Sequence, residues 1–383
     1  MSIIKMQFKG VRVWLGSALI LGGTCMQTAA QEASPPQLPQ EQIDEVGRTV
    51  TTFMARHKIP GLSIAIVAEG ELAWSNGYGV ADVENSVPAK STTAYRSASI
   101  GKTMTATAAM QLAESGKLDL NADIRDYCPA FPSKQWKITS LNLLTHTSGI
   151  RHYGGPKDQE EQNSSVHYQS VVEALTPFKD DPLLFEPGTK YLYSTYGFDV
   201  LGCVIQGVAK VPFLTYMSTH VWDPSGMKAT RDDDPSAIIP NRAAKYTLVG
   251  NELRNAPMID MSNRLPAGGY ITTAVDLARF AQAVLGDRLI KRETFQRMIV
   301  PTKLPSGESV EYGLGWGMEL EPWHGDTYVF HGGSSPGESG FLVLMPRHRF
   351  AVAFLTNLDG VLDRELLAED VTRIVLGFGP RKE

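Results

Sequence analysis

Strand-like segments lie near both ends of this chain, and helical patterns fill its middle. Apolar runs at 62–68 and 72–78 flank Glu69-Gly70-Glu71, which is a hairpin signal. Runs at 341–345 and 350–356 are joined by only four residues. Because short turns join these strands, and not helical crossovers, we expect antiparallel pairing. The sequence predicts an α+β fold, an α/β/α sandwich. Its antiparallel sheet is built from both chain ends and flanked by helices, with a mostly helical insertion.

The helical patterns set the expected extent of that insertion. Segments with apolar residues at helical spacing are expected to be helices: 42–57, 99–115, 199–208 and 362–376. A chain of 383 residues is too long for one small domain, so we expect two closely packed domains. We predict a sheet-containing domain from 41–98 and 300–383, and a mostly helical domain from 99–299.

The first thirty residues have the pattern of an export signal. Basic residues precede an apolar run at 13–23, and that run is too short to span a bilayer. Small residues follow, up to Ala30. We expect a signal peptide over 1–30, cut after Ala30, and a secreted or periplasmic protein with no stable membrane anchor. Residues 31–40, rich in Pro, Gln and Ser, predict a flexible linker.

Two other interpretations of this segment stay open. The apolar run is either cleaved or retained as an anchoring helix, and Cys25 raises the possibility of a lipoprotein. Once Cys25 is removed, only Cys128 and Cys203 remain. Both lie in apolar contexts, which favours two buried free thiols over a bridge.

Charge and motif content exclude several function classes. The 36 Lys and Arg against 41 Asp and Glu give a formal charge of −5, and no segment forms a basic stripe. A nucleic-acid partner therefore lacks its electrostatic footprint. Neither an HExxH motif nor a paired-cysteine zinc pattern occurs, so no metal or other cofactor is implied.

The first candidate for chemistry is Ser99-Ile100-Gly101-Lys102. Residues three apart on a helix share a face, so the two side chains are adjacent. A serine hydroxyl is a weak nucleophile until a base takes its proton. A buried lysine of lowered pKa can do that, or can keep a neighbouring base anionic. The same spacing occurs at Ser2 and at Ser225, but only Ser99 opens a long helical pattern. The other interpretation of Ser99 is a plain N-cap of that helix.

The second candidate is Tyr193-Ser194-Thr195, just before the helix expected over 199–208. A tyrosine pKa near 10 makes a poor base at neutral pH. Beside a lysine ammonium that pKa would fall, and the phenolate would accept a serine proton. This requires Tyr193 and Lys102 to meet in space. The alternative is an ordinary packed aromatic residue.

The third candidate is His331-Gly332-Gly333-Ser334, just before the strand expected at 341. Glycine lets a substrate approach the backbone closely. A backbone N–H on a strand edge, together with that of Ser99, would form an oxyanion hole with two donors. A glycine-rich loop with a surface histidine is the other interpretation.

One overlapping motif points elsewhere. Gly333-Ser334-Ser335-Pro336-Gly337 matches the G-x-S-x-G nucleophile elbow, which needs a strand, a sharp turn and then a helix. A strand pattern follows here instead, so Ser335 is not expected to be a nucleophile.

The three candidate motifs, in this order, resemble the serine β-lactamase and penicillin-binding protein superfamily. The resemblance is closest to its class C-like branch. That branch holds class C β-lactamases, D-alanyl-D-alanine carboxypeptidases, D-aminopeptidases, family VIII esterases and a mitochondrial β-lactamase-like protein. The resemblance covers nearly all of the mature chain. Further stretches support it: Tyr95–Ser99, Leu143–Ile150, Gly268–Tyr270 and Tyr312–Trp316.

The resemblance implies a role for each motif. By position, Ser99 becomes the nucleophile, Lys102 its proton partner and Tyr193 the general base of an acyl-enzyme mechanism without a metal. The backbone N–H of Ser334 joins that of Ser99 in the oxyanion hole. The substrate-binding residues would then be Thr195, His331 and Gly333. His146 is expected to be structural.

Two positions depart from the family pattern. Thr195 stands where Asn is usual, which replaces an amide by one hydroxyl. His331 stands where β-lactamases have Lys, so a fixed cation for a substrate carboxylate is lost. Both changes favour a serine hydrolase of small esters or short D-amino-acid peptide amides, with weak or no β-lactamase activity. A D-alanyl-D-alanine carboxypeptidase, a true β-lactamase, and a penicillin-binding sensor or assembly scaffold are the alternatives.

Overall fold

The computed structural model describes residues 37–154, 158–319 and 323–379. The expected signal peptide over 1–30 and most of the expected linker lie outside the described residues. Cleavage and export therefore stay predictions.

The centre of the fold is a sheet of seven strands in the order β11-β12-β13-β14-β1-β2-β3. Its strands are β1 (Gly61–Ala68), β2 (Glu71–Asp82), β3 (Val87–Pro88), β11 (Gly317–Met318), β12 (Val329–Ser335), β13 (Glu338–Met345) and β14 (Phe350–Thr356). Every neighbouring pair is antiparallel, and β1 pairs with β14 with Leu62 opposite Thr356. The prediction of an antiparallel sheet built from both chain ends is confirmed.

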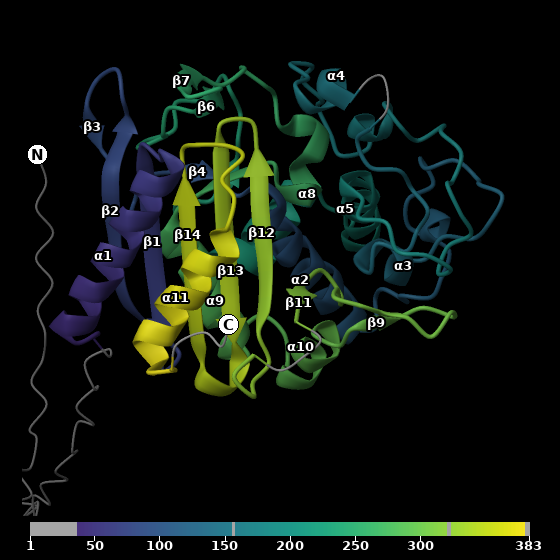
Figure 1. The fold of residues 1–383 in the computed structure, drawn as a ribbon. Coiled ribbons are helices and arrows are strands. Elements are labelled where there is room, and N and C mark those ends of the chain that lie inside the picture. The colour runs from purple at the N-terminus through teal and green to yellow at the C-terminus, as the bar shows by residue number, and fades with distance from the viewer. Residues whose placement is uncertain (1–36, 155–157, 320–322, 380–383) are drawn as a thin grey trace, which may run out of the picture. The chain divides into compact units, whose positions relative to one another are not determined.

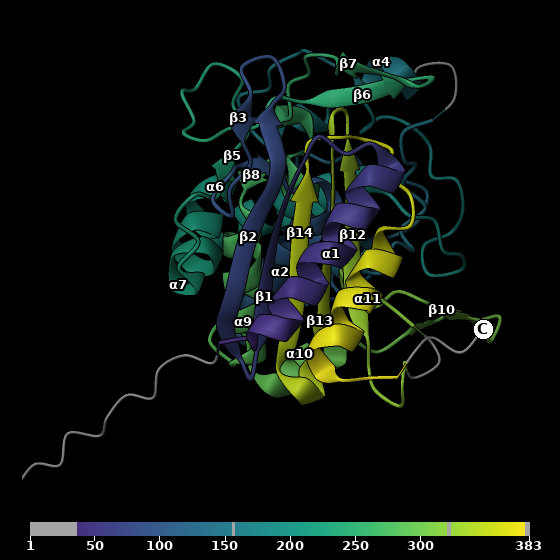
Figure 2. The ribbon, with the colours of Figure 1, turned by 60° about the vertical axis from the view of Figure 1, so that its left-hand side comes forward.

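Helices cover both faces of the sheet (Figures 1 and 2). Helices α1 (Gln40–His57) and α11 (Arg364–Leu376) pack together on one face, and α9 (Ala274–Leu285) packs against β1 and β14 on the other. Successive side chains of a strand point to opposite faces. Accordingly, Ile64 and Ile66 belong to the core under α1 and α11, whereas Ala65 and Val67 belong to the opposite core.

The remaining elements lie mostly between β2 and β11 in the chain. The helices are α2 (Gly101–Glu114), α3 (Ser140–Leu144), α4 (Asp158–Gln162), α5 (Thr195–Ala209), α6 (Phe213–Met217), α7 (Asp223–Ser225), α8 (Leu265–Gly268) and α10 (Arg292–Met298). Short strands complete the fold: β4 (Tyr95–Arg96), β5 (Arg231–Asp232), β6 (Tyr246–Val249), β7 (Glu252–Asn255), β8 (Tyr270–Thr272), β9 (Thr302–Lys303) and β10 (Ser309–Val310). The domain boundaries expected from the sequence stay predictions, although α9 from the 99–299 segment packs on the sheet.

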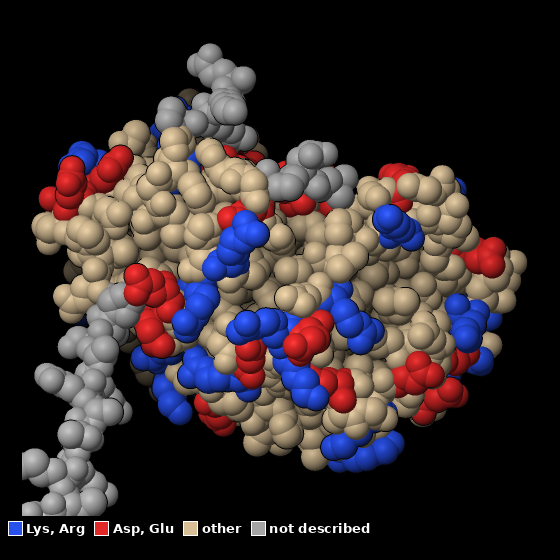
Figure 3. Space-filling model, turned by 90° about the horizontal axis from the view of Figure 1, so that it is seen from below, with Lys and Arg blue, Asp and Glu red and all other residues tan. Residues whose placement is uncertain are grey.

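Charges of both signs are interspersed on the face shown in Figure 3. Among the described residues, no single helix has the length and apolar composition of a membrane span. One pair of successive helical segments in the described residues, Thr195–Ala209 and Phe213–Ser225, has that length and composition when taken together, but the pair is bent by 78°.

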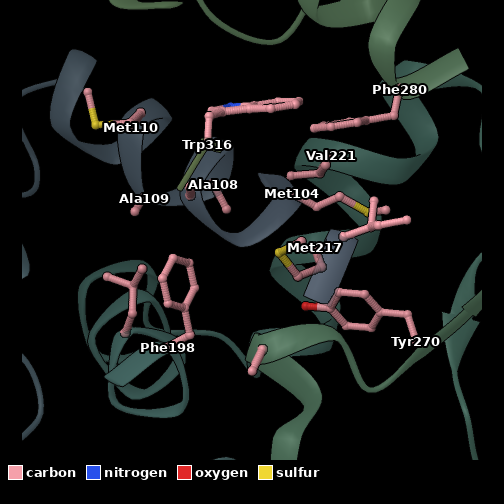
Figure 4. Close-up of a cluster of buried hydrophobic side chains, with 14 of the residues drawn as sticks. Met104, Ala108, Ala109, Met110, Phe198, Met217, Val221, Tyr270, Phe280 and Trp316 are labelled. Carbon is pink, nitrogen blue, oxygen red and sulfur yellow. The ribbon is translucent and has the colours of Figure 1, made fainter. Parts of the chain in front are cut away.

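Helix α2 runs through the core of the helical part and is buried on nearly every side. Its Met104 and Ala108 lie among Phe198, Met217, Tyr270 and Trp316, and Trp316 stacks parallel to Phe280 (Figure 4). A helix with apolar surroundings on all faces is a core helix. Lys102 on this helix is therefore carried into the interior and is fully buried.

Cys128 and Cys203 form a disulfide, so the prediction of two free thiols is wrong. They are 75 positions apart, but their Cα atoms lie within 5.6 Å of each other. The close approach of two backbones brings them together. A Cβ placed on Gly207 of α5 would lie 1.7 Å from the carbonyl oxygen of Tyr127. Only glycine allows this contact, and no local sequence pattern shows it.

Candidate active site

Ser99 lies in a single helical turn, η1 (Ala98–Ile100), immediately before α2. The residue that caps α2 is Ile100, so the N-cap interpretation of Ser99 is wrong. Ala98 has a φ of 43°, a left-handed conformation that is uncommon for a non-glycine residue. Such backbone strain is common at functional sites. The turn is held by the backbone bond from Ser97 N–H to the carbonyl of Tyr270, and it leaves Ser99 partly exposed.

Lys102 points at Ser99 from the first turn of α2. Its Nζ donates to Ser99 Oγ at 3.1 Å, to Thr195 Oγ1 at 3.3 Å and to the carbonyl of Ala267 at 3.2 Å. Desolvation lowers the pKa of Lys102 to about 7, although the charge of Asp199 opposes this change. A substantial fraction of Lys102 is therefore a neutral amine at neutral pH, able to accept a proton from Ser99.

Tyr193 meets Lys102, as the sequence argument required. The lysine Nζ lies 4.9 Å from the centre of the tyrosine ring. The expected fall of the tyrosine pKa does not occur. Burial raises the pKa of Tyr193 well above 10, and a hydrogen bond with Ser99 only partly opposes the rise. At neutral pH Tyr193 is a phenol that can donate a proton. The groups are brought together as predicted, but the amine of Lys102 is the readier base.

His331 is buried and has both ring nitrogens occupied. Its Nδ1–H donates to the carbonyl of Gly332 at 2.7 Å, and its Nε2 accepts from the hydroxyl of Tyr312 at 3.0 Å. Burial, together with the nearby Lys102, lowers the pKa of His331 to about 3. His331 is therefore neutral throughout the physiological range and provides no cation.

Gly333 brings strand β12 against the turn that carries Ser99. A Cβ on Gly333 would lie 2.6 Å from the carbonyl oxygen of Ser97. Ser334 follows it on the strand and is exposed, opposite Ser339 of β13. The close contact places this part of β12 beside Ser99, as an oxyanion hole shared by the two backbones requires.

Thr195 opens α5 and is 5% exposed. Its Oγ1 accepts a hydrogen bond from Lys102, and its backbone N–H donates to Nδ1 of His152 at 3.2 Å. In this structure the hydroxyl is directed at the lysine. Its expected contact with substrate stays a prediction.

Asp199 is a member of the site that the sequence argument missed. It lies four residues after Thr195 on the same face of α5 and is fully buried. Desolvation raises the pKa of its carboxyl well above the usual range, and the positive charges of Lys102 and Arg264 oppose that rise. The i, i+4 spacing from the Tyr-Ser-Thr motif is the signal that points to it.

Tyr312 is a second residue of the site that the motifs do not assign. In the sequence it only supports the family resemblance, and no local pattern predicts its hydrogen bond to His331.

His146 supports the ring of Tyr193. It is buried, with a φ of 55°, and its Nδ1 accepts the backbone N–H of Ser194 at 3.1 Å. The rings of His146 and Tyr193 are 4.3 Å apart. Burial lowers the pKa of His146 well below 6.5, so this neutral side chain has the structural position expected for it.

The two other serine motifs take no part in this cluster. Ser335 ends β12 at a tight hairpin into β13, so the helix that a nucleophile elbow needs is replaced by a strand. Ser225 ends the short helix α7 and donates to the carbonyl of Val221 at 2.6 Å. Within the described part of the chain, no group of three His, Cys, Asp or Glu side chains could hold a metal ion.

Comparisons with known proteins agree with this geometry. A family model described as "Beta-lactamase" matches residues 46–376. The mouse mitochondrial serine beta-lactamase-like protein LACTB is 28% identical, over 75% of this chain and 69% of its own length. Protein flp of Staphylococcus aureus strain MW2 is also 28% identical, over 88% of this chain and 66% of its own.

Solved structures share the fold. The octameric penicillin-binding protein homologue from Pyrococcus abyssi has a TM-score of 0.76 at 24% identity, covering 89% of this chain and 79% of its own. EstCE1, described as a hydrolase with promiscuous acyltransferase activity, has a TM-score of 0.75 at 21% identity. The match covers 88% of this chain and 99% of EstCE1.

The family match, together with the Ser99–Lys102–Tyr193 cluster, defines a serine hydrolase of the β-lactamase and penicillin-binding protein superfamily. The chain belongs to the beta-lactamase family, whose model spans most of its length.

Proposed function

We propose that this protein hydrolyses small esters or amides of short D-amino-acid peptides through an acyl-enzyme on Ser99, with weak or no β-lactamase activity. The observation that carries the proposal is the Lys102 amine, bonded to Ser99 Oγ at 3.1 Å with its pKa lowered to about 7. Nucleophile and base are within hydrogen-bond reach, which is the arrangement that covalent catalysis needs.

The proposed reaction begins when the substrate carbonyl binds between the backbone N–H groups of Ser99 and Ser334. Ser99 Oγ attacks the carbonyl carbon as its proton passes to Nζ of Lys102. The tetrahedral intermediate then collapses, the bond to the leaving group breaks, and the hydroxyl of Tyr193 protonates that group. Lys102 restores the proton to Tyr193. Water then attacks the acyl-enzyme by the same route in reverse, releasing the acid and the Ser99 hydroxyl.

The neutral state of His331 supports esters and peptides over β-lactams. A β-lactam carries a carboxylate beside the ring, and a fixed cation at this strand would bind it. Here the imidazole is neutral and is held by Tyr312 and Gly332. A D-stereospecific amidohydrolase from Streptomyces and a β-lactamase/D-alanine carboxypeptidase from Pseudomonas syringae share the fold, so peptide substrates remain within its range.

We also propose that the protein works outside the cytoplasm. The Cys128–Cys203 disulfide supports this proposal, because such bonds form and persist in oxidising compartments. The export-signal pattern over 1–30 points to the same location.

A steady-state assay tests the proposed function. We expect the mature protein to hydrolyse a short p-nitrophenyl ester with kcat/KM above roughly 10⁴ M⁻¹s⁻¹, within the usual range for enzymes. The Ser99→Ala variant should lose this activity and lose covalent labelling by a fluorophosphonate. Unchanged hydrolysis in Ser99→Ala would overturn the assignment. A protein that takes no label would be a binding module or scaffold.

A further inference from the structure

A pocket of about 520 Å³ opens directly beside the catalytic cluster. Its lining includes five aromatic rings, those of Tyr191, Tyr193, Tyr312, Phe330 and His331. These rings come from three separate segments of the chain, and the three segments converge at this pocket. A group that enters this pocket therefore meets aromatic surfaces next to the reacting atoms.

The charge on this pocket has one sign. Glu308 and Glu311 line it at the two ends of strand β10, and both residues are exposed. Of the lining residues, all of which lie in the described part of the chain, these two are the ones that carry a formal charge at neutral pH. His331 adds none, because burial holds it neutral.

The two cations whose charges act on His331 are held by other groups. Lys102 donates to Ser99, Thr195 and Ala267, and the guanidinium of Arg364 donates to the carbonyl of Gly333. Neither side chain lines the pocket. An anionic substrate group in the pocket would face two carboxylates without a lining cation to compensate them.

The position of Tyr193 bears on which part of the substrate enters the pocket. The group that protonates a leaving group must lie within hydrogen-bond reach of it. Tyr193 is hydrogen-bonded to Ser99 and also lines the pocket. Because Tyr193 protonates the leaving group in the mechanism proposed above, we place the leaving group toward Tyr191, Tyr312 and the two glutamates.

We propose that this pocket binds a cationic leaving group, an amine or quaternary ammonium on a short apolar arm. The aromatic faces attract a cation through their quadrupoles, and the carboxylates of Glu308 and Glu311 add Coulombic attraction. This inference rests on the proposed function and names the substrate class of the same site.

Three thioesters of butyric acid test the proposal, because they differ only in the leaving group. Thiocholine is cationic, 3,3-dimethylbutanethiol is its neutral isostere, and 3-mercaptopropionate is anionic. The released thiol is measured at low ionic strength. We expect kcat/KM for the cationic ester to exceed that of the neutral one about fivefold or more, and the anionic ester to be the poorest. Raising the salt to 0.5 M should reduce the difference between the cationic and neutral esters, because exposed charges are then screened.

Variants locate the effect. Glu308→Gln/Glu311→Gln should bring the cationic-to-neutral ratio of kcat/KM toward that expected from the aromatic walls alone. Glu41→Gln, an exposed glutamate in the first turn of α1, is the matched control and should retain the wild-type ratio. Equal rates for the cationic and neutral esters, or a ratio that the double variant leaves unmoved, would overturn the proposal.

A binding measurement separates this inference from the proposed function. If Ser99 turns over none of the thioesters, the catalytic proposal fails, but the pocket is still testable in the Ser99→Ala variant. Phenyltrimethylammonium is titrated into that variant with and without Glu308→Gln/Glu311→Gln. Several-fold weaker binding after loss of the two carboxylates supports the cation site, and identical binding refutes it.

Discussion

The replacement Asp199→Asn should make this enzyme faster at low pH. Asp199 is buried one helical turn beyond Thr195. The positive charges of Lys102 and Arg264 favour its ionised form against desolvation, and the negative charge of that form raises the pKa of Lys102. Arg264 is the other charged group that influences both pKa values, and the charge of Asp199 in turn raises the pKa of the neutral phenols of Tyr153 and Tyr270. Desolvation already outweighs this charge, so removing the carboxylate leaves desolvation less opposed and the pKa of Lys102 should fall further.

The size of the effect follows from the titration of Lys102. With a pKa of about 7, the neutral amine is about one-tenth of the total at pH 6 and about nine-tenths at pH 8. Loss of a neighbouring opposite charge lowers a pKa by about one unit or more. At pH 6, kcat/KM of Asp199→Asn should therefore rise about fivefold, while the value at pH 8.5 should hardly change.

The assay is kcat/KM for a p-nitrophenyl ester from pH 5 to 9 at constant ionic strength, with folding checked by circular dichroism. Asp276→Asn is the control. It removes a buried carboxylate on α9 that bonds the backbone N–H of Ala229 at 2.8 Å and not the lysine. A purely structural role for Asp199 would lower activity at every pH without moving the midpoint. A midpoint that stays in place or moves upward in Asp199→Asn would refute the reasoning.

Three further predictions follow from the site and the core. Tyr193→Phe should lower kcat/KM for a p-nitrophenyl ester by about 10²–10⁴-fold, because it removes the proposed proton donor; full activity would remove Tyr193 from the mechanism. His331→Lys should raise kcat/KM for nitrocefin relative to a neutral ester, and an unmoved ratio would contradict the carboxylate argument. The double variant Cys128→Ser/Cys203→Ser should lower the free energy of unfolding by about 4 kcal/mol in urea titrations. Unchanged stability would show that the bridge is absent.

Local patterns were enough for much of the fold. Strand and helix periodicity depends on neighbours within a few residues, so the two terminal hairpins and the helices α1, α2, α5 and α11 could be predicted, whereas the other helices were not placed. Within the predicted helices, one difference lies at 99–115, expected as one helix, where η1 precedes α2. Ala98, with its left-handed φ, directly follows Ser97, which bonds to Gly268 of α8 and Tyr270 of β8, and no local pattern encodes these contacts.

The sequence by itself determined which residue types are available for catalysis and their order in the chain. Ser99 and Lys102 could be paired from sequence because helical geometry alone makes residues three apart adjacent. The tertiary structure decided the protonation of the site. Burial lowers the pKa of Lys102, raises that of Tyr193, and keeps His331 neutral. It also paired Cys128 with Cys203 across 75 positions. Desolvation and long-range contact depend on what surrounds a side chain, and those surroundings exist only once distant segments have packed together.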